Sequence, residues 1–249
     1  MRFILIWLLV FTVALTASAA NDPLRDSQQC VLVLAPNWNS TTGVLHTFER
    51  ANTTSDWHRR GNAIPVVLGK KGLGWGVGLM NAAGTRGPRK IEGDNKVPAG
   101  IFRLGPAFGY AAASDARWVK VPYVPLTAQS EGIDDPQSLY YNRLVERSKI
   151  AHIDWRTSEH MRRLDGLYKW GVVVAHNPRA TPGAGSCIFL HIWKTSATPT
   201  TGCTAMGERD LVKLLRWLDP NAHPILVQMP RPDYSVVRSN YRLPAIPTP

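Results

Sequence analysis

The sequence predicts a mainly β domain with a few short helices, and three observations support this. Many short segments rich in Val, Ile, Phe and Trp are separated by Gly, Pro and Asn, which is typical of strands joined by turns. One stretch near the C-terminus has clear helical periodicity. Hydrophobic residues make up 44% of the chain, which is enough for a sizeable core and argues against overall disorder.

Eight segments have the composition of strands and two that of helices. The expected strands cover residues 30–35, 43–50, 63–69, 100–105, 117–124, 169–176, 186–193 and 223–229. The clearer helix is expected at 207–219, where an apolar stripe is followed by Pro220; the stripe consists of Leu211, Leu214, Leu215 and Leu218. A second helix is expected from about 158 to 168.

The N-terminal residues 1–20 have the pattern of a secretory signal peptide. Arg2 precedes a short apolar run, and Ala17-Ser18-Ala19 forms a cleavage signal, whereas the run is short for an uncleaved membrane anchor. Residues 21–249 are then expected to form a single exported domain with no stable membrane span. It would carry an insertion around 130–168 and an extended, basic, Pro-rich tail from about 231.

The formal net charge is +11, from 29 Lys and Arg against 18 Asp and Glu. Nucleic acid is not the expected partner, because the chain has neither a run of basic residues nor an aromatic-basic repeat. For an exported protein, anionic polymers of the cell envelope or membrane surfaces are the natural partners. The alternative is a basic protein whose charge has no specific target. The oligomeric state does not follow from the sequence.

Two further patterns fit cofactor or metal sites poorly. The Gly-rich stretch 69–79 matches neither the P-loop nor the dinucleotide-binding pattern, and its alternating glycines are more typical of a strand packed against a bulky neighbour. His152, Asp154 and His160 are close in sequence, but their spacing matches no zinc motif, so a solvated surface is the default. We expect no cofactor and no metal.

The three cysteines, Cys30, Cys187 and Cys203, are an odd number, so at least one thiol is left without an intramolecular partner. Cys203 follows a Thr-Thr-Gly turn and precedes the expected helix, whose N-terminus would lower the pKa of the thiol. His191 lies in an apolar strand. Alternation along that strand places His191 on one face with Phe189 and Trp193, opposite Ile188, Leu190 and Ile192. Cys203 and His191 could therefore form a nucleophile and base pair.

Three stretches of the chain resemble the L,D-transpeptidase catalytic domain, the YkuD-like family of cysteine enzymes that act on bacterial peptidoglycan. They are KIEGDNKVPAGIFRLG (90–105), WGVVVAHNPRATPGAGSCIFLHIW (170–193) and PTTGCTAMGERDLVKLLRWLDP (199–220). They are similar to the family's Gly-Asp-x-x-x-Pro-x-Gly segment, its histidine strand and its Gly-Cys turn. The resemblance implies a β-sandwich-like domain with few helices, in the periplasm or cell envelope of a bacterium.

The resemblance also implies roles for individual residues. Cys203 would be the nucleophile and His191 the general base and acid, oriented by the backbone carbonyl of Ile192. The N–H groups of Gly202 and Cys203 would form an oxyanion hole. Thr201 and Ala205 replace a histidine and a polar residue that the family usually has, which bears on acceptor choice.

Four residues are candidates for substrate binding. They are Thr201, Thr204, Arg179 and Lys194.

The implied reaction is acyl transfer between peptidoglycan stem peptides through a thioester on Cys203, contributing to cell-wall cross-linking and cell shape or to D-amino-acid exchange. The first alternative is an L,D-carboxypeptidase or endopeptidase that hydrolyses the same peptides. The second is a non-catalytic cell-wall-binding protein. A third is a structural protein in which Cys203 is oxidised. The pairing of Cys30 with Cys187 stays open, and Cys187 could be a small buried hydrophobic residue.

Overall fold

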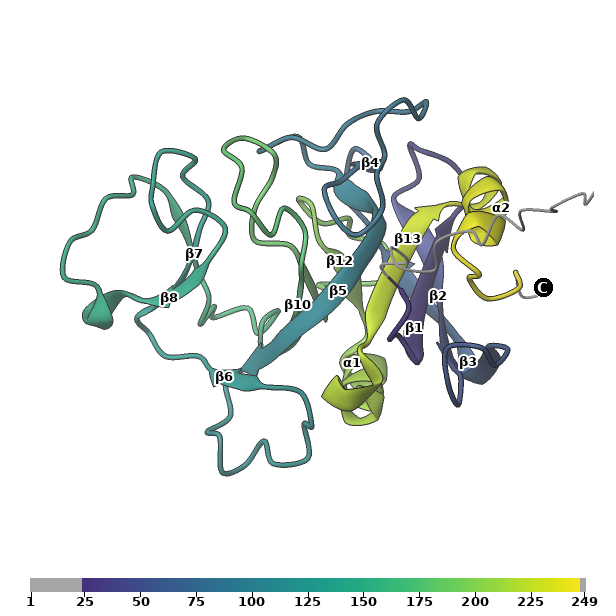
Figure 1. Ribbon diagram of the computed structural model, residues 1–249. Coiled ribbons are helices and arrows are strands. Elements are labelled where there is room, and N and C mark those ends of the chain that lie inside the picture. The colour runs from purple at the N-terminus through teal and green to yellow at the C-terminus, as the bar shows by residue number, and fades with distance from the viewer. Residues whose placement is uncertain (1–23, 247–249) are drawn as a thin grey trace, which may run out of the picture.

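The computed structural model describes residues 24–246 and is mainly β with few helices, as the sequence predicts (Figure 1). The expected signal segment 1–20 lies outside the described residues. The strands are β1 (Gln29–Ala35), β2 (Thr42–Glu49), β3 (His58–Val67), β4 (Leu73–Trp75), β5 (Val97–Gly109), β6 (Tyr123–Pro125), β7 (Ser130–Ile133), β8 (Leu144–Glu146), β9 (Ser158–His160), β10 (Trp170–Val174), β11 (Phe189–Ile192), β12 (Thr204–Met206) and β13 (Ile225–Pro230). The helices are α1 (Glu208–Trp217), α2 (Arg231–Asn240) and the short 3-10 turns η2 (Arg147–Lys149) and η3 (Pro220–Ala222).

One large sheet forms the body of the molecule. Its strand order is β10-β11-β12-β3-β2-β1-β13-β5-β4, and β6 pairs in parallel with the C-terminal end of β5. Because β5 also pairs with β10, the sheet closes on itself in a barrel-like manner. The closing strand β5 spans 13 residues, so one of its parts can pair with β13 and another with β10.

The main core fills the interior of this sheet. Strands β1 and β13 are buried along their whole length and contribute most of their residues to it. A second, smaller apolar cluster lies around Phe108, Tyr168, Phe189 and Cys203. Leu190 and Ile192 belong to the main core and Phe189 to the second cluster, so β11 alternates between two packed faces as the sequence predicts. The second cluster therefore supports the side of the sheet that carries Cys203.

The inserted segment forms a separate small sheet with the order β8-β7-β9, which projects away from the large sheet in Figure 1. The expected helix at 158–168 is wrong, because β9 pairs with β7 there. A helix would place Met161, Leu164 and Tyr168 on one face. Instead Met161 and Tyr168 are buried while Leu164 is fully exposed.

Helix α1 occupies the stretch predicted for it and buries Leu211, Leu214 and Leu215. The expected extended tail from about 231 is wrong, because α2 occupies 231–240. A proline in its first turn is compatible with a helix start, and Asp233 lies in the same turn, where a negative charge is favoured. Tyr234 is fully buried in the main core, which fixes the helix to the body. Its hydroxyl donates to the Pro244 carbonyl at 2.7 Å, which holds the segment after the helix against it.

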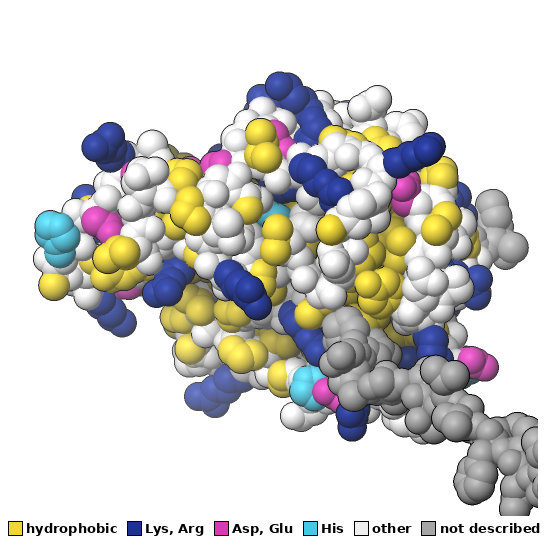
Figure 2. Space-filling view, turned by 45° about the horizontal axis from the view of Figure 1, so that its top comes forward, with side chains coloured by type: hydrophobic (Ala, Val, Ile, Leu, Met, Phe, Trp, Pro, Cys, Tyr) yellow, Lys and Arg dark blue, Asp and Glu magenta, His cyan; other side chains and the backbone are white. Residues whose placement is uncertain are grey.

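The face of the molecule in Figure 2 carries its positive charge in a distributed form. On the face in Figure 2, Lys and Arg side chains stand at separate points and do not form one continuous patch. That face therefore offers no single basic surface for a polyanion. Among residues 24–246, no helix is long and apolar enough to cross a membrane.

Candidate active site

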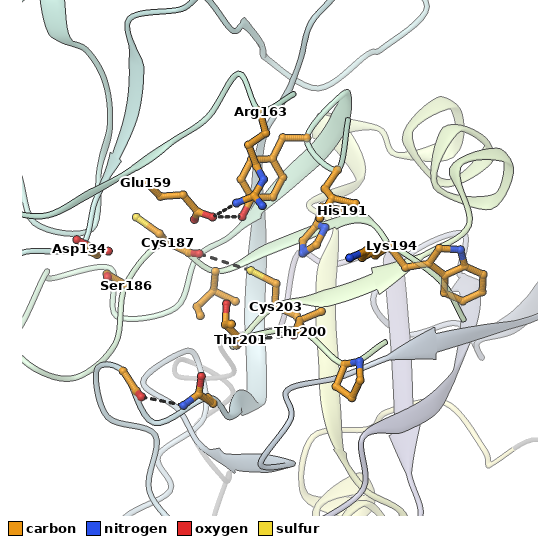
Figure 3. Close-up of a pocket in the computed structure, with 18 of the residues that line it drawn as sticks. Asp134, Glu159, Arg163, Ser186, Cys187, His191, Lys194, Thr200, Thr201 and Cys203 are labelled. Atoms are coloured by element: carbon orange, nitrogen blue, oxygen red, sulfur yellow. Dashed lines mark hydrogen bonds and ion pairs between the residues drawn. The ribbon is translucent and has the colours of Figure 1, made fainter. Parts of the chain in front are cut away.

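A cavity of about 380 Å³ lies where β11, the turn before β12 and the inserted sheet come together (Figure 3). Its lining includes Cys203, His191, Lys194, Asp134, Glu159 and Arg163. It thus contains the thiol and the imidazole that the sequence singles out, together with charged side chains of both signs.

Two parallel strands bring the histidine and the cysteine to the same face. β11 pairs with β12, and His191 is opposite Ala205. Cys203 lies two residues before Ala205, so it is on the face that also carries His191. The thiol and the imidazole face the same cavity in Figure 3. Strand pairing therefore brings together two residues that are 12 positions apart in the chain.

The imidazole of His191 is held in one tautomer. Its Nδ1 lies 2.8 Å from the carbonyl oxygen of Ile192, and a carbonyl can accept a hydrogen bond but cannot donate one. Nδ1 therefore carries the hydrogen, which leaves Nε2 free to act as a base. The ring of Tyr168 packs edge-on against His191 with centroids 5.1 Å apart. Burial lowers the pKa of His191 to about 4, so the imidazole is neutral at neutral pH.

The thiol of Cys203 is buried and hydrogen-bonded. Sγ accepts from the Phe189 N–H at 3.3 Å and lies 3.6 Å from the Cys187 carbonyl oxygen, to which the thiol can donate. Burial, and secondarily the charge of Glu159, raises the pKa of Cys203 to about 12. The sequence-based expectation of a lowered pKa is therefore wrong. β12 separates Cys203 from the N-terminus of α1, and the dipole effect falls off within a turn.

These two pKa values define the resting state of the pair. A thiol whose pKa is raised and an imidazole whose pKa is lowered are both neutral across the physiological range. The arrangement therefore suits general-base catalysis, in which His191 takes the thiol proton as sulfur attacks. It does not suit a permanent thiolate–imidazolium ion pair.

The turn that carries Cys203 is held by the side chain of Thr200. Thr200 Oγ1 donates to the Cys203 carbonyl at 2.5 Å and accepts from the Gly202 N–H at 3.2 Å. The backbone of Thr200 is bound in turn to Leu68, whose carbonyl accepts its N–H at 2.8 Å. Gly202 lines the cavity, but its N–H is bound to Thr200 Oγ1 and is not free to bind an oxyanion in this arrangement. Sequence reasoning missed Thr200, because a threonine in a turn has no distinctive local pattern.

Replacing Thr200 with valine is expected to loosen this turn. Valine has the same shape but makes neither hydrogen bond, so the free energy of unfolding should fall by about 1–2 kcal/mol. Acylation of Cys203 should slow about tenfold, since the thiol loses its fixed position. Thr200→Ser, which restores the hydroxyl, should recover both. Thermal unfolding and single-turnover acylation measure the two effects; equal acylation rates for valine and serine would contradict the assigned role.

The segment around Asp94 forms another wall of the cavity, which Glu92, Gly93 and Asn95 line. Asp94 accepts hydrogen bonds from the Lys96 N–H at 2.9 Å and from Lys90 Nζ at 2.6 Å, and the Lys90–Asp94 pair is almost completely buried. Lys90 lines the cavity, and its charge partly opposes the rise in the pKa of Cys203. The Gly-Asp motif thus holds a loop in place and keeps a lysine beside the thiol.

The four candidate substrate-binding residues divide evenly. Thr201 and Lys194 line the cavity. Thr204 does not, because it is buried in β12 and donates to Gln228 Oε1 at 2.6 Å. Arg179 lies at a different hollow, which is lined by Tyr141 and neighbouring residues. The structure therefore brings Thr201 and Lys194 to this cavity and places Thr204 and Arg179 elsewhere.

Sequence reasoning also missed a group from the inserted segment. Tyr168 donates to Glu159 Oε1 at 2.7 Å, and Arg163 reaches the same oxygen at 3.2 Å. Asp134 lines the cavity beside them. The Glu159–Arg163 spacing of four residues resembles a helical ion pair, which gave no indication that these residues face a thiol.

In residues 24–246, no group of three or more His, Cys, Asp or Glu side chains could hold a metal ion. His152, Asp154 and His160 do not form such a group. All three cysteines are free thiols, so Cys203 is available for chemistry. A scan of the sequence against protein-family models found no match, and neither did a search of curated proteins.

Proposed function

We propose that this protein is an L,D-transpeptidase that acts on peptidoglycan stem peptides through a thioester on Cys203. The observation that carries the proposal is the orientation of His191. Its Nδ1 donates to the Ile192 carbonyl at 2.8 Å, which leaves Nε2 as the basic nitrogen of a ring that lines the same cavity as the thiol. This is the arrangement that the resemblance to the family implies, and it lies in a cavity large enough for a peptide segment.

The proposed reaction has two halves. In the first, Cys203 sulfur attacks a peptide carbonyl carbon while its proton passes to His191, and an oxyanion develops near the Gly202 turn. The C–N bond then breaks, His191 returns the proton to the leaving amine, and a D-amino acid departs. In the second, an amine of another stem peptide attacks the thioester, loses a proton to His191 and regenerates the thiol.

Water can replace the second amine, which makes an L,D-carboxypeptidase or endopeptidase the alternative within the same chemistry. The free thiol at the cavity favours either enzyme over a protein that merely binds the cell wall or one with an oxidised Cys203. The partition of the thioester between amine and water depends on how well the site holds the acceptor amine. Thr201, next to Gly202 in the cysteine turn, stands where the family usually has a histidine.

Incubation with tetrapeptide-containing muropeptides separates the two enzymes. A transpeptidase should produce cross-linked dimers, or exchange the terminal residue for an added D-amino acid, both visible by mass spectrometry. Trimming of monomers without dimers or exchange would support the hydrolase. The absence of any acyl-enzyme, trimming or cross-linking would contradict both.

A further inference from the structure

Negative charge develops on two atoms during the proposed acylation. The Cys203 sulfur gives its proton to His191, and the charge then passes to the oxygen of the attacked carbonyl. The Gly202 N–H is bound to Thr200 Oγ1 at 3.2 Å, so in this arrangement it is not free to stabilise that oxygen. A positive charge elsewhere in the cavity wall would serve both atoms.

In the described part of the chain, three cationic side chains line the cavity, namely Lys90, Arg163 and Lys194. Arg163 forms ion pairs with Glu159 and Asp165, so two carboxylates offset its charge. Lys194 is exposed, and solvent screens the field of an exposed charge. Lys90 differs from both, since only 3% of its side chain is exposed. Its field acts through the protein interior, where screening is weakest.

The Lys90–Asp94 pair is oriented with its positive end toward the cavity. Lys90 lines the cavity and Asp94 does not. The Asp94 carboxylate is turned into its own loop, where it accepts from the Ile91 and Lys96 N–H groups, both at 2.9 Å. Lys90 Nζ donates to Asp94 Oδ1 at 2.6 Å and to the Ile91 carbonyl at 2.7 Å. The loop therefore holds the ammonium in place while its carboxylate stays outside the cavity lining.

The side chain of Lys90 is packed under the loop that leads to the histidine strand. A Cβ atom at Gly185 would lie 3.2 Å from Lys90 Cε and 2.8 Å from His176 Nε2, and φ at Gly185 is +101°. A glycine thus allows this loop to close over the lysine. Burial, and secondarily the charge of Lys90, lowers the pKa of His176 to about 4, so the imidazole adds no second positive charge beside the ammonium.

Lys90 and Glu159 act on the Cys203 thiol in opposite directions. Burial contributes most to the rise in the pKa of Cys203 to about 12, and the charge of Glu159 adds to it, whereas the charge of Lys90 lowers the pKa. Loss of Lys90 would therefore leave the thiol harder to ionise.

The other groups at the cavity do not replace Lys90. Tyr168, Cys187 and His191 are neutral at neutral pH, because burial raises the pKa of the first two and lowers that of the imidazole. The remaining charged groups of the lining are Glu92, Asp134, Arg163 and Lys194. Two of these four are anions, and the two cations are the paired arginine and the exposed lysine.

We propose that Lys90 is a positioning residue that compensates, through space, the negative charge on the Cys203 sulfur and then on the oxyanion during acylation. Lys90 does not contact the substrate, because its ammonium is buried. A cation that is already fixed in place offsets charge as it develops and needs no reorganisation. The effect on the oxyanion rests on the proposed function, whereas the effect on the thiol does not.

Alkylation of Cys203 by iodoacetamide tests the effect on the thiol in the full chain, with peptide mapping to assign the modified cysteine. The thiolate is the reactive form, so the rate follows the thiolate fraction. Lys90→Met removes the charge and keeps a long side chain. It should react about three- to tenfold more slowly than the parent throughout about pH 7–10, since a nearby cation favours the thiolate. The difference should persist in about 0.5 M NaCl, because the pair is buried. Lys90→Arg, which restores the charge, should recover most of the rate.

Lys213→Met is the matched control, because Lys213 also pairs with an aspartate but lies outside the cavity lining. It should leave alkylation unchanged. Lys90→Met/Asp94→Asn is measured beside the single variant, so that no buried carboxylate is left without its cation, and thermal unfolding confirms that each variant is folded. The double variant should also react more slowly than the parent. A parent-like rate in the double variant would assign any slow reaction of Lys90→Met to the unpaired Asp94 and would overturn the inference, as would equal rates in the parent and Lys90→Met.

Acylation by a tetrapeptide-containing muropeptide then separates Lys90 from the reaction. Lys90→Met should lower the single-turnover rate by at least about tenfold, since stabilisation of the oxyanion is lost as well. Added to Cys203→Ser, it should leave muropeptide binding unchanged. Slower alkylation of Lys90→Met together with no acylation of the parent would support the effect on the thiol and contradict the proposed function. Equal acylation of the parent and Lys90→Met would support the proposed function and overturn the role of Lys90.

Discussion

Cys203→Ser is expected to lower acyl transfer on muropeptides by at least about 10⁴-fold, the scale seen when a covalent nucleophile is removed. A serine hydroxyl is a much weaker acid than a thiol, and His191 has a lowered pKa that makes it a modest base. The substitution is nearly isosteric at a buried position, so the fold should persist. Rates of D-amino-acid release and dimer formation by mass spectrometry measure the loss.

Cys30→Ala is the control for general effects of removing a thiol, because Cys30 lies in β1 within the main core. It should retain acyl transfer, with thermal unfolding used to measure any loss of stability. Exposure to a carbapenem should give a covalent adduct that peptide mapping assigns to Cys203, and Cys203→Ser should abolish it. An adduct on Cys187, which lines the same cavity, or full activity in Cys203→Ser would contradict the assignment of the nucleophile.

His191→Gln is expected to lower kcat by about 10²–10⁴-fold, the range for loss of a general base. Glutamine can still donate to the Ile192 carbonyl but supplies no basic nitrogen at the position of Nε2. His58→Gln, at an exposed position of β3, is the matched control and should be without effect. Binding of the donor peptide should change little, so a defect confined to KM would contradict the role of base.

The pH dependence follows from the same two groups. The pKa of His191 is lowered to about 4, so the neutral, basic form is present above that pH and is lost as the pH falls through it. The pKa of Cys203 is raised to about 12, so the thiol keeps its proton until strongly alkaline pH. Profiles of kcat/KM should therefore be flat between about pH 5 and 9 and fall near pH 4. An acid limb near pH 6.5 would indicate an ordinary, solvated histidine.

Most of the expected strands and the proposed chemical pair were accessible from sequence because their signals are local, but the expected strand at 117–124 is wrong, since only Tyr123–Pro125 is a strand there. Alternating burial in 189–192 follows from the pleat, and Leu211, Leu214 and Leu215 lie on one face of a helix because of its period. The resemblance of three short stretches to a known family then connected His191 with Cys203. Their shared position on neighbouring parallel strands agrees with that expectation.

Predictions failed where longer-range contacts decide the structure. The 158–168 stretch is a strand and turn because β7 offers it a partner, which no local pattern reveals. The tail at 231–240 is a helix because Tyr234 finds a buried position and an acceptor at Pro244. Thr204 directly follows Cys203 and Arg179 lies before the strand of His191 in the sequence. In the structure, Thr204 instead binds Gln228 in the interior and Arg179 lies at a different hollow.

By itself, the sequence determined the mainly β character, helix α1 and the two residues proposed to do the chemistry, since each depends on side-chain type and spacing along the chain. Only the tertiary structure decided the electrostatic environment of the Cys203 thiol. Burial reverses the shift in pKa that a nearby helix suggested, and Thr200, Asp134 and Glu159 reach the cavity through strand pairing and an inserted sheet. The charge state of a group depends on everything packed around it, and packing joins residues that the sequence keeps far apart.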